Sequence, residues 1–190
     1  WMSSAVLLAK SIYVWLDQLS SRYQRAITTL AEIPEEELAR LADWGFNALW
    51  LIGIWERSSA SREIKQLCGN PEAEASAYAL YAYRVAMDLG GDAALAELET
   101  RCRRHGIRLA CDVVPNHTGI DSEWVLQHPD WFLQTESPPY PGYRFNGPDL
   151  CDAEGISIRI EDGYWDNSDA AVVCEHHDHY TGRRRYIDHG

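Results

Sequence analysis

The chain has 190 residues, of which 46% are hydrophobic and 24% charged, and it carries a formal net charge of −12 at pH 7. This length and composition are those of a globular domain with a sizeable core and argue against a disordered chain. The negative charge argues against nucleic acid as a partner, because binding to phosphate backbones normally requires clustered Lys and Arg. The short basic runs at 101–104 and 183–185 are expected to be solvated.

The cysteines and the hydropathy of the chain indicate the cellular compartment in which the protein is expected. The five cysteines are odd in number and form no Cys-x-x-Cys pair, which favours a reducing environment. The apolar run at 5–9 is too short for a membrane span or a secretory signal core. We therefore expect a cytoplasmic protein without a membrane partner. The chain starts at Trp1 rather than at an initiator methionine, so we also expect a fragment, whose missing start could have carried a signal.

The first half of the chain contains candidate strands and a helix. Residues 12–16 form a β-branched and aromatic run that predicts a first strand. A helix is predicted from Pro34, which suits a first helical position, to the stop signal Gly45. Residues 46–54 are expected to form the second strand.

A second helix and a third strand follow a long connection at 55–91, a length that favours function. Asp92 is a plausible helix N-cap and Gly106 a plausible helix end. The apolar residues of 107–114 predict a short strand buried on both faces. The order strand, helix, strand, helix, strand predicts an α/β fold with a parallel sheet.

The chain after His117 is rich in Pro, Gly, Asp and aromatic residues. It predicts a loop-rich region with a small antiparallel sheet. The candidate strands are 143–145, 156–160, 171–173 and 184–187.

The sharpest cluster of polar chemistry follows the third strand. Ligand sites in parallel α/β folds lie at the carboxyl ends of strands. There Asp112 offers a carboxylate, Asn116 a carbonyl oxygen, and His117 a donor for a substrate hydroxyl. The structural alternative, left open by spacing alone, is that Asp112 caps backbone amides and His117 is an ordinary loop histidine.

Four segments resemble a known family. Asp-Val-Val-Pro-Asn-His-Thr-Gly at 112–119 is similar to the first signature region of the α-amylase family of glycoside hydrolases. Residues 41–51 resemble the family's first helix and second strand, residues 78–84 its loop before the second helix, and residues 105–109 the lead-in to its third strand. The resemblance covers roughly residues 11 to 120.

The resemblance implies a partial (β/α)8 TIM barrel followed by an inserted domain. Residues 1–117 would be the first part of the catalytic barrel, with its first three strands. Residues 118–190 would begin a loop-rich inserted B domain with a small antiparallel sheet, incomplete here. Because such a barrel needs about 250 residues and eight strands, the chain would be an amino-terminal fragment.

The resemblance also implies roles for single residues. His117 would donate a hydrogen bond to the sugar at the cleavage subsite, and Tyr78 would stack on the same sugar. Asp112 would be a structural carboxylate that orders the active-site floor. Asn116 matches a position that ligates calcium in many members, which makes calcium the possible cofactor.

The family's catalytic carboxylates have no counterpart in this chain. A retaining glycosidase uses a nucleophile and an acid/base carboxyl group roughly 5 Å apart. In the family these lie after the fourth and fifth strands, with a third aspartate after the seventh. No catalytic residue is therefore expected in this fragment, and the fragment itself should be inactive.

The resemblance implies a parent enzyme that is a retaining α-glycosidase or transglycosidase. Its substrate would be an oligo-, poly- or disaccharide with α-glucosidic bonds. The alternative is a non-catalytic carbohydrate-binding or scaffolding protein on the same fold. A third hypothesis places a metal at Glu175-His176-His177-Asp178-His179, but this run lacks a helical His spacing, so a solvated loop is favoured.

Overall fold

The computed structural model describes residues 2–166, 168 and 173–188. The chain divides into two compact units. The first unit comprises Trp1–Glu56 and Tyr83–Val113, and the second comprises Arg57–Ala82 and Val114–Gly190. The expected domain boundary lay at residue 118, whereas the observed division also assigns 57–82 to the second unit.

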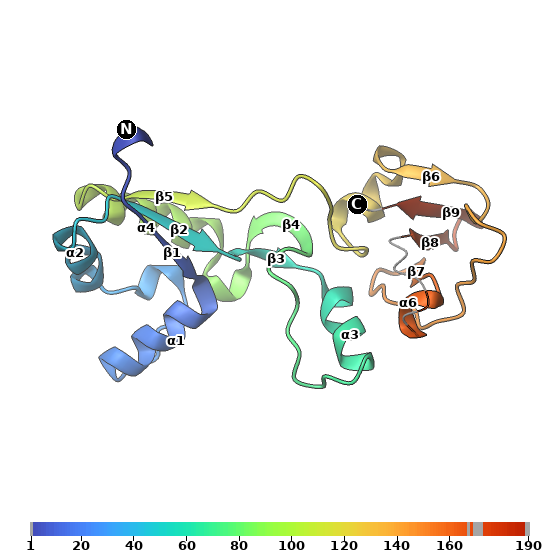
Figure 1. Ribbon diagram of the computed structural model, residues 1–190, viewed down its shortest axis with the longest axis horizontal. Coiled ribbons are helices and arrows are strands. Elements are labelled where there is room, and N and C mark those ends of the chain that lie inside the picture. The colour runs from blue at the N-terminus through green and yellow to red at the C-terminus, as the bar shows by residue number, and fades with distance from the viewer. Residues whose placement is uncertain (1, 167, 169–172, 189–190) are drawn as a thin grey trace. The chain divides into compact units, whose positions relative to one another are not determined.

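The first unit contains a parallel sheet of three strands, β1 (Leu7–Ser11), β2 (Ala48–Ile52) and β5 (Arg108–Cys111). Their order is β1-β2-β5, and both pairings are parallel (Figure 1). The second and third strands therefore lie inside the ranges predicted for them. The parallel arrangement predicted from the element order is confirmed.

The prediction of a first strand at 12–16 is wrong, because these residues lie in α1 (Ile12–Tyr23). The run is β-branched and aromatic, but its apolar residues also follow helical spacing. The buried side chains of α1 are Ile12, Trp15, Leu16 and Leu19. The first strand is instead β1, which immediately precedes the helix.

Helices of the first unit cover one face of the parallel sheet. Leu8, Leu49 and Leu109 are cross-strand neighbours and pack into the core with side chains of α1, α2 (Glu35–Asp43) and α4 (Gly91–Arg104). On the other face Leu7 is 48% exposed, and Ala9 and Ala110 are exposed.

The apolar sequence of the third strand predicts burial on both faces. In the structure only one face of this strand is buried. Arg108 and Ala110 are exposed, because no described element of the first unit covers that face. Helix α4 begins slightly earlier than predicted, because its N-cap is Gly90 rather than Asp92. Asp92 Oδ1 accepts a hydrogen bond from the backbone amide of Val85 at 3.0 Å.

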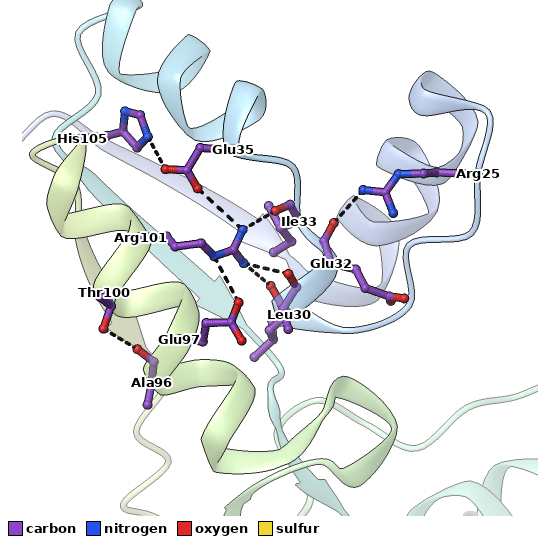
Figure 2. A network of polar contacts seen from close by, with 11 residues as sticks. Arg25, Leu30, Glu32, Ile33, Glu35, Ala96, Glu97, Thr100, Arg101 and His105 are labelled. Atoms are coloured by element: carbon purple, nitrogen blue, oxygen red, sulfur yellow. Dashed lines mark hydrogen bonds and ion pairs between the residues drawn. The ribbon is translucent and has the colours of Figure 1, made fainter.

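The guanidinium of Arg101 joins α4 to the chain that leads into α2 (Figure 2). The side chain is only 13% exposed, so the expectation of a solvated basic run is wrong for Arg101, whereas Arg103 and Arg104 are exposed. Burial is possible because acceptors surround it: Ile33 O at 2.5 Å, Leu30 O and Ala31 O at 3.0 Å, Glu97 Oε1 at 3.8 Å and Glu35 Oε2 at 3.9 Å.

The long segment before α4 is structured. It contains β3 (Trp55–Arg57), α3 (Ser59–Leu67) and β4 (Leu80–Val85), and β3 and β4 form a two-stranded sheet. Short 3-10 helices occur at η1 (Met2–Ser4), η2 (Leu30–Glu32), η3 (Met87–Leu89) and η4 (Pro129–Trp131). Within the described residues, no helix has the length and apolar character needed to cross a membrane.

The second unit contains the predicted small antiparallel sheet (Figure 1). Its strands are β6 (Leu133–Thr135), β7 (Ile156–Ile160), β8 (Val173–Asp178) and β9 (Arg183–Asp188), in the order β6-β9-β8-β7. Two short helices, α5 (Glu123–Gln127) and α6 (Gly163–Asp166), belong to the same unit.

Two of the four strand predictions in this region agree with the structure. The strand at 156–160 is β7, and 184–187 lies within β9. Residues 143–145 form no strand. For the prediction at 171–173, residues 171 and 172 lie outside the described part of the chain, and Val173 begins β8.

The prediction of a solvated loop at 175–179 is wrong, because most of this run belongs to β8, an inner strand of the sheet. Glu175 and His176 are both buried. Their side chains point to opposite faces, since neighbouring residues of a strand alternate. The flanking Cys174 is part of the apolar core of this unit.

Candidate functional site

Asp112 follows directly after β5 in the first unit and is buried. Its Oδ1 accepts a hydrogen bond from Trp50 Nε1 at 2.8 Å, and its Oδ2 accepts one from the backbone amide of Gly53 at 2.6 Å. The backbone oxygen of Asp112 accepts a third bond from Trp55 Nε1 at 2.9 Å. The carboxylate therefore fastens the end of β5 to the end of β2.

Asn116 and His117 belong to the second unit. The segment that contains them lies close to residues 79 and 80. Gly119 N donates to Leu80 O at 2.8 Å, and Ser58 N donates to Ala79 O at 2.9 Å. A side chain at Gly119 would place its Cβ only 2.4 Å from Ser58 Cβ. The close approach of these segments therefore requires the glycine at 119.

His117 is half-buried and lines a cavity of about 240 Å³ in the second unit. Three of the lining residues carry polar end groups, namely Lys65, His117 and Tyr164, and the rest of the wall is mostly apolar. The other lining residues are Ser58, Ser61, Ile64, Ala79, Thr118, Gly119, Ile120 and Ile160. Such a mixture of apolar walls and a few donors suits a small hydroxyl-bearing molecule.

Tyr78 lies on an exposed turn beside this cavity. Its neighbour Ala79 lines the cavity, whereas Tyr78 itself is not among the lining residues. The phenol ring is exposed and thus open to stacking against a ligand. None of the described residues that line the cavity is Asp or Glu.

Asp121 is a buried residue of this site that the sequence reasoning missed. Its carboxylate accepts hydrogen bonds from Ser58 Oγ at 2.5 Å, from Ser59 Oγ at 2.8 Å and from the backbone amide of Ala60 at 3.1 Å. Asp121 therefore fixes the N-terminus of α3, where a negative charge is favourable. The signal available in the sequence was the serine pair Ser58 and Ser59, a residue type that is typical of a helix N-cap.

The calcium site that the resemblance implies at Asn116 stays a prediction. Asn116 is exposed, and calcium requires about six to eight oxygen ligands. In the part of the chain that the structure describes, no three His, Cys, Asp or Glu side chains come together as a metal site. The same finding applies to the histidine-rich run at 175–179.

The chain is similar to known proteins in sequence and in fold. The family model for the catalytic domain of α-amylase matches residues 27–145, which is more than half of the chain. No curated protein sequence matches the chain.

Three solved structures resemble the fold. An α-amylase from Lactobacillus plantarum is 22% identical over 73% of this chain and 29% of its own, with a TM-score of 0.52. A trehalose-6-phosphate hydrolase from Bacillus licheniformis is 15% identical over 98% of this chain and 28% of its own, with a TM-score of 0.54. An inactive mutant of MutB in complex with isomaltulose is 18% identical over 73% of this chain and 23% of its own, with a TM-score of 0.51. The chain thus spans less than a third of each.

Proposed function

Because the chain belongs to the α-amylase family, whose catalytic domain is a TIM barrel, we propose that it is the amino-terminal part of a retaining α-glycosidase or transglycosidase. The substrate is an oligo-, poly- or disaccharide with α-glucosidic bonds. One observation carries the proposal: the family match at 27–145 contains Tyr78, Asp112, Asn116 and His117.

The proposed architecture assigns β1, β2 and β5 to the first three strands of the eight-stranded barrel. Their parallel order supports this assignment, as does the sheet face that the described helices leave exposed. In a closed barrel that face would be covered by the other strands, since parallel sheets are normally buried on both faces. Residues 118–190, which contain the antiparallel sheet, are the start of the inserted B domain.

The site residues have distinct proposed roles. Asp112 is a positioning residue, supported by its hydrogen bonds to Trp50 and Gly53, which hold two strand ends in place. His117 donates a hydrogen bond to a sugar hydroxyl, supported by its position in the cavity wall. Tyr78 stacks on the apolar face of the sugar ring, supported by its exposed phenol.

Bond cleavage itself needs two carboxyl groups about 5 to 5.5 Å apart, one as nucleophile and one as acid then base. We assign these to segments beyond residue 190, so the 190-residue chain is inactive alone. Binding and cleavage are thus separated along the sequence.

The proposed partner is carbohydrate, without nucleic acid or membrane, in the cytoplasm. The cysteines support the reducing compartment, because all five are free. Burial raises the pKa of the Cys102 thiol to about 12 and that of Cys174 to about 12. Both thiols are therefore inert at neutral pH.

A non-catalytic carbohydrate-binding protein is the second candidate. It is favoured by the described lining of the His117 cavity, which offers groups that can bind a sugar but no carboxylate. The coding sequence beyond residue 190 separates the two. The enzyme requires an Arg-x-Asp triplet at the end of a fourth strand and a glutamate at the end of a fifth. If that sequence continues into a complete barrel without these residues, the enzyme proposal is wrong.

A further inference from the structure

The antiparallel sheet of the second unit has one apolar and one polar face. Ile160, Cys174 and Ile187 are cross-strand neighbours in the buried core. The adjacent row, Arg159, Glu175 and Tyr186, points to the opposite face because strand residues alternate. This polar row spans β7, β8 and β9, which are neighbouring strands of the sheet (Figure 1).

The carboxylate of Glu175 organises the polar face. It is buried, and its Oε2 accepts hydrogen bonds from Arg184 Nη1 and from the Tyr186 hydroxyl, both at 3.1 Å. Arg159 Nη1 lies 3.8 Å from Oε1. The Arg184 side chain nevertheless remains 52% exposed, so its guanidinium retains donors that can meet a ligand.

A loop is fixed next to this face by two carboxylates. Asp162 accepts hydrogen bonds from the backbone amide of Asn146 at 2.7 Å and from its Nδ2 at 2.8 Å. Glu161 accepts one from the backbone amide of Arg144 at 3.3 Å. The Phe145 ring also lies against that of Tyr186, with centroids 5.1 Å apart. The loop is therefore held in place before any ligand arrives.

An open groove of about 700 Å³ lies between this loop and the polar face. The sheet contributes Arg159, Glu175, Arg184 and Tyr186, and the loop contributes Tyr143 and Asn146 among others. Its size falls in the usual range of small-molecule sites. The groove differs from the His117 cavity, because Ile160 lines that cavity while its neighbour Arg159 lines the groove.

We propose that this groove is a second carbohydrate-binding site, for a neutral oligosaccharide. The planar guanidinium groups, the Glu175 carboxylate and the Asn146 amide supply paired donors and acceptors for neighbouring hydroxyls. The Tyr143 ring supplies a face for the C–H surface of a sugar. The groove is lined by the carboxylates of Asp149 and Glu175 and by the guanidinium groups of Arg144, Arg159 and Arg184. These opposite charges nearly balance, which suits a neutral ligand. The proposal is independent of the His117 site and of catalysis.

Calorimetric titration of the 190-residue chain with maltoheptaose tests the proposal. The background is a Tyr78→Ala, His117→Ala double variant, in which the first proposed site is removed. We expect binding in this background, weakened about tenfold or more by Arg184→Ala. Arg183→Ala is the matched control, because it makes the same charge change on the neighbouring residue, which points to the opposite face.

Tyr143→Ala is the second test variant, since it removes a loop ring and leaves the Glu175 hydrogen bonds intact. It too should weaken binding, with an unchanged circular dichroism spectrum and melting temperature. No binding in the double-variant background, or equal affinity in Arg184→Ala and Arg183→Ala, would overturn the proposal. Preference for glucose 6-phosphate over maltoheptaose would overturn the assignment of a neutral ligand.

Discussion

The carboxylate of Asp112 lies 2.6 Å from the backbone amide of Gly53, a residue 59 positions earlier in the chain. With the 2.8 Å bond from Trp50 Nε1, it holds the ends of β2 and β5 together. A charged acceptor forms shorter and stronger hydrogen bonds than a neutral one. This pair therefore connects a family signature residue to the stability of the parallel sheet.

Asp112→Ala should lower the free energy of unfolding by about 2 to 4 kcal/mol, because it leaves two donors without their acceptor. Asp112→Asn retains an acceptor oxygen and should cost less. Urea unfolding measures both effects. Asn116→Ala is the control, since Asn116 is exposed in the same segment. Equal stability of Asp112→Ala and Asn116→Ala would show that the carboxylate is not structural.

Arg101→Ala should destabilise the first unit by about 2 to 3 kcal/mol, because three backbone carbonyls lose a charged donor. Arg103→Ala is the matched control on the same helix. Its side chain is 72% exposed and pairs only along the helix, with Glu99, a contact worth about 0.5 kcal/mol or less. Similar midpoints of urea unfolding for the two variants would contradict the role given to Arg101.

Stability at acid pH should depend on Glu32. Hydrogen bonds from the backbone amides of Thr28 and Thr29 lower the pKa of its carboxyl group to about 2. Since the folded pKa lies below the unfolded value, the contribution is present above about pH 4.5 and is lost as the pH falls toward about 2. Glu32→Gln should make the melting temperature fall less than that of the parent chain as the pH is lowered from about 5 to about 3. Parallel pH profiles would contradict this.

The uncovered face of the parallel sheet should bind a hydrophobic dye. On this face Leu7 is 48% exposed, and Ala9 and Ala110 are exposed. We expect ANS fluorescence with the native chain and a broad, low melting transition. Leu7→Lys should reduce the fluorescence, whereas Leu67→Lys, at an exposed site of the second unit, should not. A sharp cooperative melt without dye binding would refute the expectation.

Sequence patterns predicted α2, β2, α4 and β5 of the first unit but missed β1 and α1, and these failures have physical causes. Residues 12–16 combine β-branched side chains with helical spacing, and burial of Ile12, Trp15 and Leu16 decides for the helix. The run at 175–178 is polar on both faces in sequence. It forms an inner strand because Glu175 finds Arg184 and Tyr186 on the neighbouring strand, which no local pattern reveals.

The site was only partly predictable for the same reason. Strand-end logic singled out Asp112 and His117. The partners of Asp112 lie about 60 residues away in sequence, so their identity depends on the strand register. Asp121 escaped notice because its carboxylate acts on the N-terminus of a helix more than 60 residues earlier.

We propose above that this chain belongs to a retaining enzyme whose catalytic carboxylates lie beyond residue 190. Proton NMR of maltoheptaose hydrolysis by the parent protein, recorded from the first minutes, tests it most directly. We predict that the new reducing end appears first as the α-anomer, and that the 190-residue chain releases none. Initial release of the β-anomer, or cleavage by the 190-residue chain, would contradict the account.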